Sequence, residues 1–252
     1  MKNINCTFNI IFKLFLIIML KTYLLFADDL VTKQDKQTDI KKNISVLIND
    51  DVKCDVAPCK LAFDTTNMVM SLVSNNLSLT NKQITNLSHN FDFQLITKFA
   101  MGKNWKNATV EQQNQLIALF RKLLIYTYSA ALDKFKDATI TIINVKIDSK
   151  KDTDKQTASV LNTVALNDSA DNQTIKVEYN LANTGVNNTW LFYDIKIADA
   201  SLVSTYRNQF NDIIQSSGIN GLIQQLESKV DNLKKINNKK NNHLNFLIYK
   251  QI

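Results

Sequence analysis

The sequence predicts an α+β fold in which helices come first, about four antiparallel strands follow, and helices return near the end. Three observations support this prediction. Up to Asp137, apolar residues recur at the spacing of one helix face. Between Thr139 and Ile197 the spacing changes to every second residue, as in strands, and helical spacing resumes at Ser201. Helices and strands that are grouped into separate runs are typical of α+β proteins.

The composition fits one domain with tails at its ends. The chain has 252 residues, of which 45% are hydrophobic, with four glycines and one proline. A sizeable core is therefore available, and a loop-dominated chain is excluded. The formal net charge is +7, but the excess of lysine lies before residue 22 and after residue 228. Because the body between them is near neutral, we expect no nucleic acid partner, which would need a basic face.

Residues 1–27 have the pattern of a signal peptide for export. Lys2 lies in a short basic region, apolar residues dominate from Ile10 to Leu20, and Ala27 precedes two aspartates. Two lysines interrupt the apolar run, which stays shorter than the roughly 18 residues that a transmembrane helix needs. We expect cleavage after residue 27, and the alternative is an uncleaved N-terminal anchor.

Three segments follow the signal peptide. Residues 28–58 are polar apart from a weak apolar island at 44–48, and a linker or a short helix fits them. Residues 59–233 carry the helical and strand patterns, so we expect them to form the domain. Residues 234–252 are rich in lysine and asparagine, and we expect a loose basic tail.

Cys54 and Cys59 remain after the signal peptide is removed. In an oxidising compartment such a pair can form a disulfide that closes a short loop around Pro58. Two free thiols are the alternative. This spacing is not typical of a metal site unless a second pair accompanies it.

Start and stop signals mark the helices between residues 91 and 132. Asp92 lies between two phenylalanines, where it either caps the following helix or orients a polar ligand group at the mouth of a pocket. Gly102 suits a left-handed residue at the end of that helix. Thr109 and Gln112 match a capping box, and the long helix after them is apolar over more than one ordinary face.

Four further helices are expected outside this region. Two precede it, from about Lys60 to Asn75 and from Thr80 to Ser88, where Thr80 is the N-cap. Two follow the strands, from Ser201 to a stop at Gly218 and from about Gly221 to Leu233.

The expected strands are rich in β-branched residues and are joined by polar loops. In the last strand, strict alternation places Leu191, Tyr193 and Ile195 on one side. It places Trp190 and Phe192 on the other side. Together with the wide apolar faces of the helices, such a sheet can enclose either a dry core or a cavity. The four strands are Thr139–Ile147, Thr157–Leu166, Thr174–Leu181 and Trp190–Ile197.

Enzymatic chemistry is poorly supported by the residues present. His89 is the one histidine outside the expected tail, and neither a nucleophile motif nor a metal-ligand motif flanks it. The chain also has no glycine-rich phosphate loop and no familiar hydrolase or zinc-protease motif. We therefore expect no catalytic residue, no metal site, no cofactor and no enzymatic activity.

A series of short motifs lies in consistent order between residues 60 and 232. They are Phe91-Asp92-Phe93, Met101-Gly102-x-x-Trp105, Glu111-Gln112, Phe120, Tyr128, Trp190 with Tyr193-Asp194, Ser201-Leu202-Val203, Tyr206-Arg207-x-Gln209-Phe210 and Gly218-x-x-Gly221-Leu222. Together they resemble the MlaC family of periplasmic phospholipid-binding proteins, of the toluene-tolerance type. One departure is Asp199-Ala200, since the family usually has a glycine before its Ser-Leu-Val motif.

The resemblance implies a curved antiparallel sheet packed with helices around a deep apolar cavity that takes acyl chains. It implies a monomeric carrier in the periplasm with phospholipid as its ligand. The carrier would exchange lipid between an outer-membrane lipoprotein complex and an inner-membrane ABC transporter complex, and so maintain the lipid asymmetry of the outer membrane. A periplasmic adaptor with a packed core and no lipid is the alternative.

Candidate site residues follow from the apolar faces and the resemblance. Asp92 and Arg207 are candidates for the headgroup or the cavity mouth, because Arg207 follows a tyrosine on an apolar helix and has a planar guanidinium group. Packing or surface roles are the alternative for Arg207 and for the tyrosines. The candidates for the cavity lining are Phe93, Phe99, Leu116, Phe120, Leu124, Tyr128, Tyr193, Val203, Tyr206 and Phe210.

Overall fold

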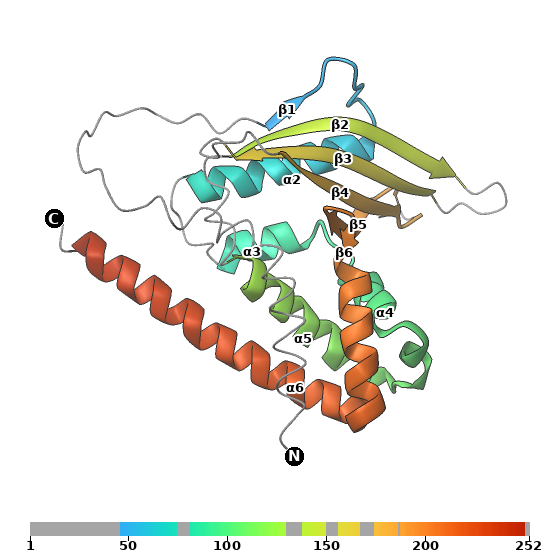
Figure 1. The fold of residues 1–252 in the computed structure, drawn as a ribbon, viewed down its shortest axis with the longest axis vertical. Helices are drawn as coiled ribbons and strands as arrows, with labels where there is room; N and C mark the ends of the chain where they lie inside the picture. The colour runs from blue at the N-terminus through green and yellow to red at the C-terminus, as the bar shows by residue number, and fades with distance from the viewer. Residues whose placement is uncertain are drawn as a thin grey trace. The chain divides into compact units, whose positions relative to one another are not determined.

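An open six-stranded sheet and several helices make up the described part of the protein (Figure 1). The computed structural model describes residues 46–74, 81–129, 138–149, 156–166, 174–185 and 187–249. All of them belong to the unit Asn43–Ile252. The α+β prediction is confirmed. The predicted signal peptide, the polar segment up to residue 45 and Thr80 lie outside the described residues.

The four predicted strands form an antiparallel meander. They are β2 (Ala138–Ser149), β3 (Gln156–Leu166), β4 (Thr174–Asn183) and β5 (Trp190–Ile197). Each strand pairs with the next along the chain.

Two short strands extend this meander at its edges. β1 (Val46–Ile48) pairs in parallel with β2, and β6 (Ala200–Ser201) pairs antiparallel with β5. The prediction of a linker or a short helix at residues 44–48 was therefore wrong for β1. Its three apolar residues lie opposite 140–142, far along the chain, so a strand of only three residues depends on this tertiary pairing.

A β-bulge interrupts the alternation in β5. Phe192 lies opposite Leu181 and Asp194 lies opposite Asn180, so Tyr193 has no partner in β4. Since one extra residue reverses the side-chain alternation, Ile195 after the bulge shares the face of Phe192 before it. The predicted sidedness of this strand was wrong beyond Tyr193 for this reason.

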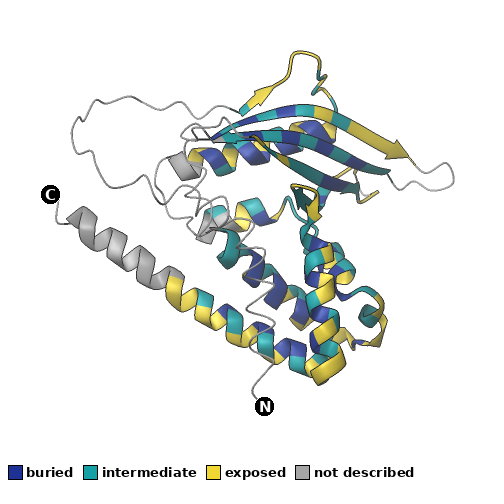
Figure 2. Cartoon of the chain, viewed as in Figure 1, coloured by how far each residue is buried: buried dark blue, intermediate teal, exposed yellow. Residues whose placement is uncertain are grey.

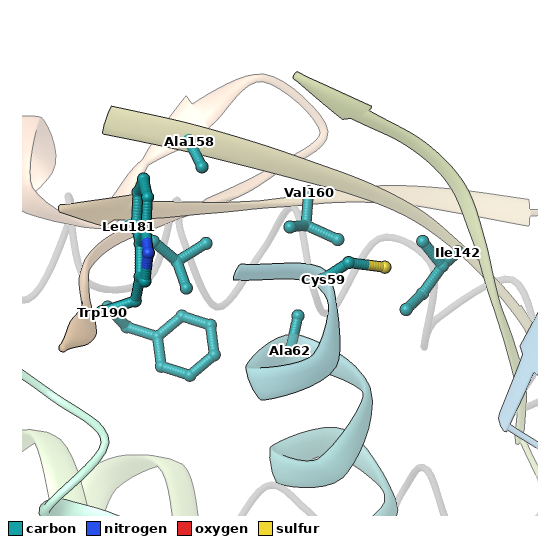
Figure 3. Close-up of a cluster of buried hydrophobic side chains, with 8 residues drawn as sticks. Cys59, Ala62, Ile142, Ala158, Val160, Leu181 and Trp190 are labelled. Atoms are coloured by element: carbon teal, nitrogen blue, oxygen red, sulfur yellow. The ribbon is translucent and has the colours of Figure 1, made fainter. Parts of the chain in front are cut away.

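Helix α2 (Ala57–Ser74) covers the apolar face of the sheet (Figure 1). Cys59 and Ala62, one helical turn apart, pack against Ile142, Val160 and Leu181 (Figure 3). Further along the helix, a second cluster of buried residues joins Met70 to Ala138, Ile140 and Val164. The first part of the core therefore lies between one helix and the sheet.

The remaining helices form the second part of the core. They are α3 (Asn81–Ser88), α4 (Phe93–Met101), the 3₁₀ helix η1 (Gly102–Asn107), α5 (Val110–Ser129) and α6 (Leu202–Tyr249). Buried residues line α5 and the first half of α6, while exposed residues alternate with them (Figure 2). This pattern is that of amphipathic helices which pack on one another.

The predicted caps are present where the structure describes them. The Asp92 carboxylate accepts a hydrogen bond from the Leu95 amide at 2.8 Å and so caps α4. Gly102 ends α4 with a φ of 52°, a region that favours glycine. In the capping box, the Gln112 amide donates to Thr109 Oγ1 at 3.2 Å and Gln112 Oε1 accepts from the Thr109 amide at 3.0 Å.

Helix α6 begins at a side-chain cap and bends at a glycine. The Asp194 carboxylate in β5 accepts from the Val203 amide at 3.0 Å and from the Ser201 hydroxyl at 2.6 Å. At Gly218 the backbone leaves helical geometry, with φ 68° and ψ −179°. The two helices predicted on either side of this glycine are therefore two arms of α6.

The second arm of α6 is longer than predicted. We expected the helix to end at Leu233 and a loose tail from residue 234, whereas α6 stays helical to Tyr249. No glycine or proline follows Gly221 in the sequence, so nothing in the backbone stops the helix.

Candidate functional site

Six of the predicted cavity residues are buried residues of α5 and α6. The ring of Phe120 is fully buried, and its centroid lies 4.8 Å from that of Tyr206 and 5.0 Å from that of Phe210. Leu116 is also fully buried, and Leu124 and Val203 are 8% and 4% exposed. The rings of Phe120, Tyr206 and Phe210 therefore join the two helices directly.

Tyr128 lies next to this cluster and makes its polar contact. Its hydroxyl lies close to the Tyr206 hydroxyl and interacts with it. Burial raises the pKa of Tyr206 to about 12, and burial together with Tyr206 raises the pKa of Tyr128. Both phenols therefore stay protonated at neutral pH and act as neutral hydrogen-bonding groups.

Phe99 and Tyr193 form a separate pair between α4 and β5. Their ring centroids are 5.7 Å apart in an edge-on arrangement, and both side chains are half-buried. Burial raises the pKa of the Tyr193 hydroxyl. Tyr193 is the bulge residue of β5, and its ring contacts Phe99 on α4.

The last predicted cavity residue, Phe93, begins a row of four rings that continues to the sheet. Its ring centroid lies 5.9 Å from that of Phe91, which lies 5.1 Å from that of Phe192, which lies 5.5 Å from that of Tyr179. We call Phe93, Phe91, Phe192 and Tyr179 the aromatic row. Phe192 is buried and the other three are half-buried.

Three members of the aromatic row were not among the predicted cavity residues. Phe91 belongs to the Phe-Asp-Phe motif, but it precedes the helix whose apolar face supplied the predicted cavity residues. It joins the row because residues 90–92 bond the β5 backbone, where the Asp92 amide donates to the Phe192 carbonyl at 2.9 Å. Phe192 lies on β5 and Tyr179 lies on the adjacent strand β4. Their contact depends on the pairing of these strands, which the sequence pattern did not reveal.

Tyr179, at the other end of the row, makes a polar contact, and further polar groups lie on neighbouring elements. Burial raises the pKa of Tyr179, whose hydroxyl accepts a hydrogen bond from Thr66 Oγ1 at 3.3 Å. Asn90 Nδ2 donates to Thr65 Oγ1 at 2.8 Å. Asn162 is fully buried and donates to the carbonyls of Val160 and Val177, while its Oδ1 has no hydrogen-bond partner in the described part of the chain.

The two predicted headgroup residues have structural contacts and lie apart. Asp92 caps the N-terminus of α4, whereas Arg207 donates from Nε to the carbonyl of Phe99 at 2.7 Å, near the C-terminus of the same helix. The Arg207 side chain also lies against Gly102, where an added Cβ would stand 3.4 Å from its Cδ. A helix of nine residues is about 13 Å long. Their predicted role toward a headgroup stays a prediction.

A disulfide joins Cys54 to Cys59, with an S–S distance of 1.96 Å and a Cα–Cα distance of 5.2 Å. Cys59 is fully buried in the first turns of α2, and Cys54 is half-buried. The bond therefore holds the segment before α2 against the helix–sheet core.

Within the described ranges, no three side chains of histidine, cysteine, aspartate or glutamate converge as metal ligands would. The helices in the same ranges include none with the length and hydropathy of a membrane span. The side chains that gather here are instead aromatic and aliphatic, with neutral polar groups among them.

These features define a class of proteins in which a mostly antiparallel sheet and several helices pack through aromatic and aliphatic side chains. The model of the MlaC protein family matches residues 66–228, more than half of the chain. The protein belongs to the MlaC family, and the resemblance noted in the sequence is confirmed.

One solved structure similar to this chain is that of the phospholipid-binding protein from Ralstonia solanacearum in complex with a phospholipid. The two chains are 28% identical, with a TM-score of 0.57. The match covers 69% of this chain and 97% of that chain, so nearly the whole of the Ralstonia fold has a counterpart here.

Proposed function

We propose that this protein is a periplasmic phospholipid carrier without enzymatic activity. The observation that carries the proposal is the similarity to a phospholipid-bound protein over 97% of that protein's length. Membership of the MlaC family supports the same role. The ligand is a phospholipid whose acyl chains enter an apolar cavity and whose headgroup stays near solvent.

The aromatic row is the surface that we assign to an acyl chain. Three of its four rings are half-buried, so they are less completely packed than Phe120 or Leu116, which are fully buried. The row runs from α4 to β4 through contacts between ring centroids of 5.1–5.9 Å. Flat apolar rings in series suit a methylene chain, because contact area and not hydrogen bonding drives the association.

The energetics of a carrier agree with such a site. Two acyl chains contain on the order of 30 methylene groups, and burying each is worth about 0.8 kcal/mol, which amounts to roughly 25 kcal/mol. This keeps a lipid out of water. A bilayer offers a similar gain, so exchange between membrane and carrier is close to balanced and needs no covalent step.

The partners follow from the same role. The carrier takes or gives lipid at an outer-membrane lipoprotein complex and at an inner-membrane ABC transporter complex, and this exchange maintains outer-membrane lipid asymmetry. Export requires the signal peptide over residues 1–27. The mass of the mature protein tests this step: a mass equal to residues 28–252 supports cleavage, and the full mass favours an anchor.

Lipid binding is tested on the full chain expressed with export to a bacterial periplasm and purified without detergent. Native mass spectrometry should find phospholipid bound to the protein in stoichiometric amount, and solvent extraction should identify it. Wild-type protein that carries no lipid and takes none from vesicles would overturn the proposal. That result would favour an adaptor with a packed core.

A matched pair of variants tests the assigned surface. Phe91→Asn places an amide in the aromatic row, whereas Val110→Asn makes a comparable change at a residue that is 66% exposed. We expect lipid occupancy to fall in Phe91→Asn and to stay unchanged in Val110→Asn. Circular dichroism confirms that both variants are folded, and equal occupancy in the two would remove the row from the site.

A further inference from the structure

A half-buried arginine lies where α3, α4 and α5 meet. Arg121, on α5, donates from Nη2 to the hydroxyl of Ser88 at the end of α3. Its guanidinium carbon lies 5.4 Å from the ring centroid of Phe93 at the start of α4. Three helices therefore hold one guanidinium group in a defined position.

This guanidinium has spare hydrogen-bonding capacity. A guanidinium group carries five N–H donors, and the Ser88 hydroxyl is its one hydrogen-bond acceptor among the described residues. Across the same part of the chain, no carboxylate forms an ion pair with Arg121. A cation that is partly removed from water and lacks a counter-ion is unfavourable, so an arriving anion stabilises it.

The contacts that Arg121 does make orient it. Ser88 is 6% exposed, and its own hydroxyl donates to the Thr85 carbonyl at 2.7 Å, which leaves its oxygen to accept from Arg121. The Phe93 ring supports one flat face of the guanidinium, as in a cation–π contact. A planar group held in this way can present two parallel N–H donors to a phosphate.

The position of Arg121 relates it to the acyl-chain surface. Phe93, the ring beside the guanidinium, is one of the two end members of the aromatic row. A phosphate at the Phe93 end of the row would therefore lie beside the guanidinium of Arg121. Arg207, by comparison, is bound to the Phe99 carbonyl and lies against Gly102.

We infer that Arg121 receives the phosphate group of the bound phospholipid and so distinguishes phospholipids from lipids that lack phosphate. This inference rests on the proposed carrier function. It assigns a headgroup site to the junction of α3, α4 and α5, and it predicts a preference that apolar burial alone does not produce.

The test compares the full-length protein with Arg121→Met and Lys122→Met. Lys122 is the next residue on α5 and is exposed, so its variant loses the same charge without touching the junction. Each protein, freed of lipid, is offered an equal mixture of phosphatidylglycerol and diacylglycerol with identical acyl chains, and native mass spectrometry measures the bound ratio. Wild type and Lys122→Met should prefer the phospholipid. In Arg121→Met the ratio of bound phosphatidylglycerol to bound diacylglycerol should fall about tenfold, because a hydrogen bond to a charged group contributes roughly that much to binding.

The outcomes separate the two proposals. If wild type binds neither lipid, the carrier function fails. If all three proteins bind both lipids in the same ratio, the carrier function stands and the role of Arg121 is overturned. A third arm adds inorganic phosphate to wild type and to Arg121→Met without lipid. If phosphate binds only to wild type while the two proteins share the same lipid ratio, the site serves free phosphate and the lipid inference is overturned.

Discussion

Asp194 controls the junction between the sheet and the longest helix, and its removal makes a quantitative test. Its carboxylate accepts hydrogen bonds from the amides of Ile195 at 2.9 Å and Val203 at 3.0 Å and from the Ser201 hydroxyl at 2.6 Å. Two of these contacts stabilise the first turn of α6. Replacing a helix cap costs about 0.5–2 kcal/mol, and a hydrogen bond to a charged group is worth about 1.5–3 kcal/mol.

We therefore expect Asp194→Ala to lower the free energy of unfolding by about 2 kcal/mol, at the upper end of the range for a cap. For a domain of this size the midpoint of thermal unfolding should fall by about 4–8 °C. Asp194→Asn keeps one acceptor oxygen but loses the charge, so its loss should be smaller. Urea unfolding followed by circular dichroism measures all three proteins.

Asp212→Ala is the matched control, because Asp212 is exposed on the same helix. Surface substitutions of this kind change stability by about 0.5 kcal/mol or less. If Asp194→Ala unfolds at the same urea concentration as Asp212→Ala with an unchanged m-value, the capping argument is refuted.

Three further predictions concern stability. Replacing Cys54 and Cys59 by serine should cost about 2 kcal/mol, since the bond closes a loop with a sequence separation of 5; dithiothreitol should destabilise wild type and leave the double variant unaffected. Phe120→Ala should cost about 3–5 kcal/mol because the ring is fully buried, and a loss no greater than that of Val110→Ala would contradict the packing. The folded-state pKa of Tyr206 is raised by burial to about 12 from 10.0. Its contribution to stability is therefore complete below its unfolded pKa and is lost as the pH rises toward the folded one. Between about pH 9 and pH 11, wild type should lose about 1 kcal/mol more than Tyr206→Phe in urea unfolding, and parallel pH curves would exclude this role.

Local signals in the sequence were reliable where the structure describes them. The Thr109–Gln112 capping box forms both of its hydrogen bonds, and Gly102 and Gly218 adopt the positive φ angles expected at helix ends. Such signals work because the residues that interact are within a few positions of each other.

Pairings between distant segments escaped prediction. β1 exists because it pairs with residues near 141, and the bulge at Tyr193 is defined by its register with β4. Neither leaves a periodic trace in its own segment. The aromatic row escaped for the same reason, since Phe91 and Phe192 meet through a bridge between segments about a hundred residues apart.

The two arginines illustrate the same division. Both Arg121 and Arg207 stand on apolar helices, and the chain pattern favoured Arg207 as the headgroup residue. Arg207 donates to the Phe99 carbonyl near the end of α4, whereas Arg121 has one hydrogen-bond acceptor, Ser88, among the described residues. The α+β class, the helix caps and the family motifs were already readable in the chain, because they depend on spacing and local hydrogen bonds. The strand edges, the reversed face of β5, the aromatic row and the contacts of the two arginines depend on distant segments that have packed together.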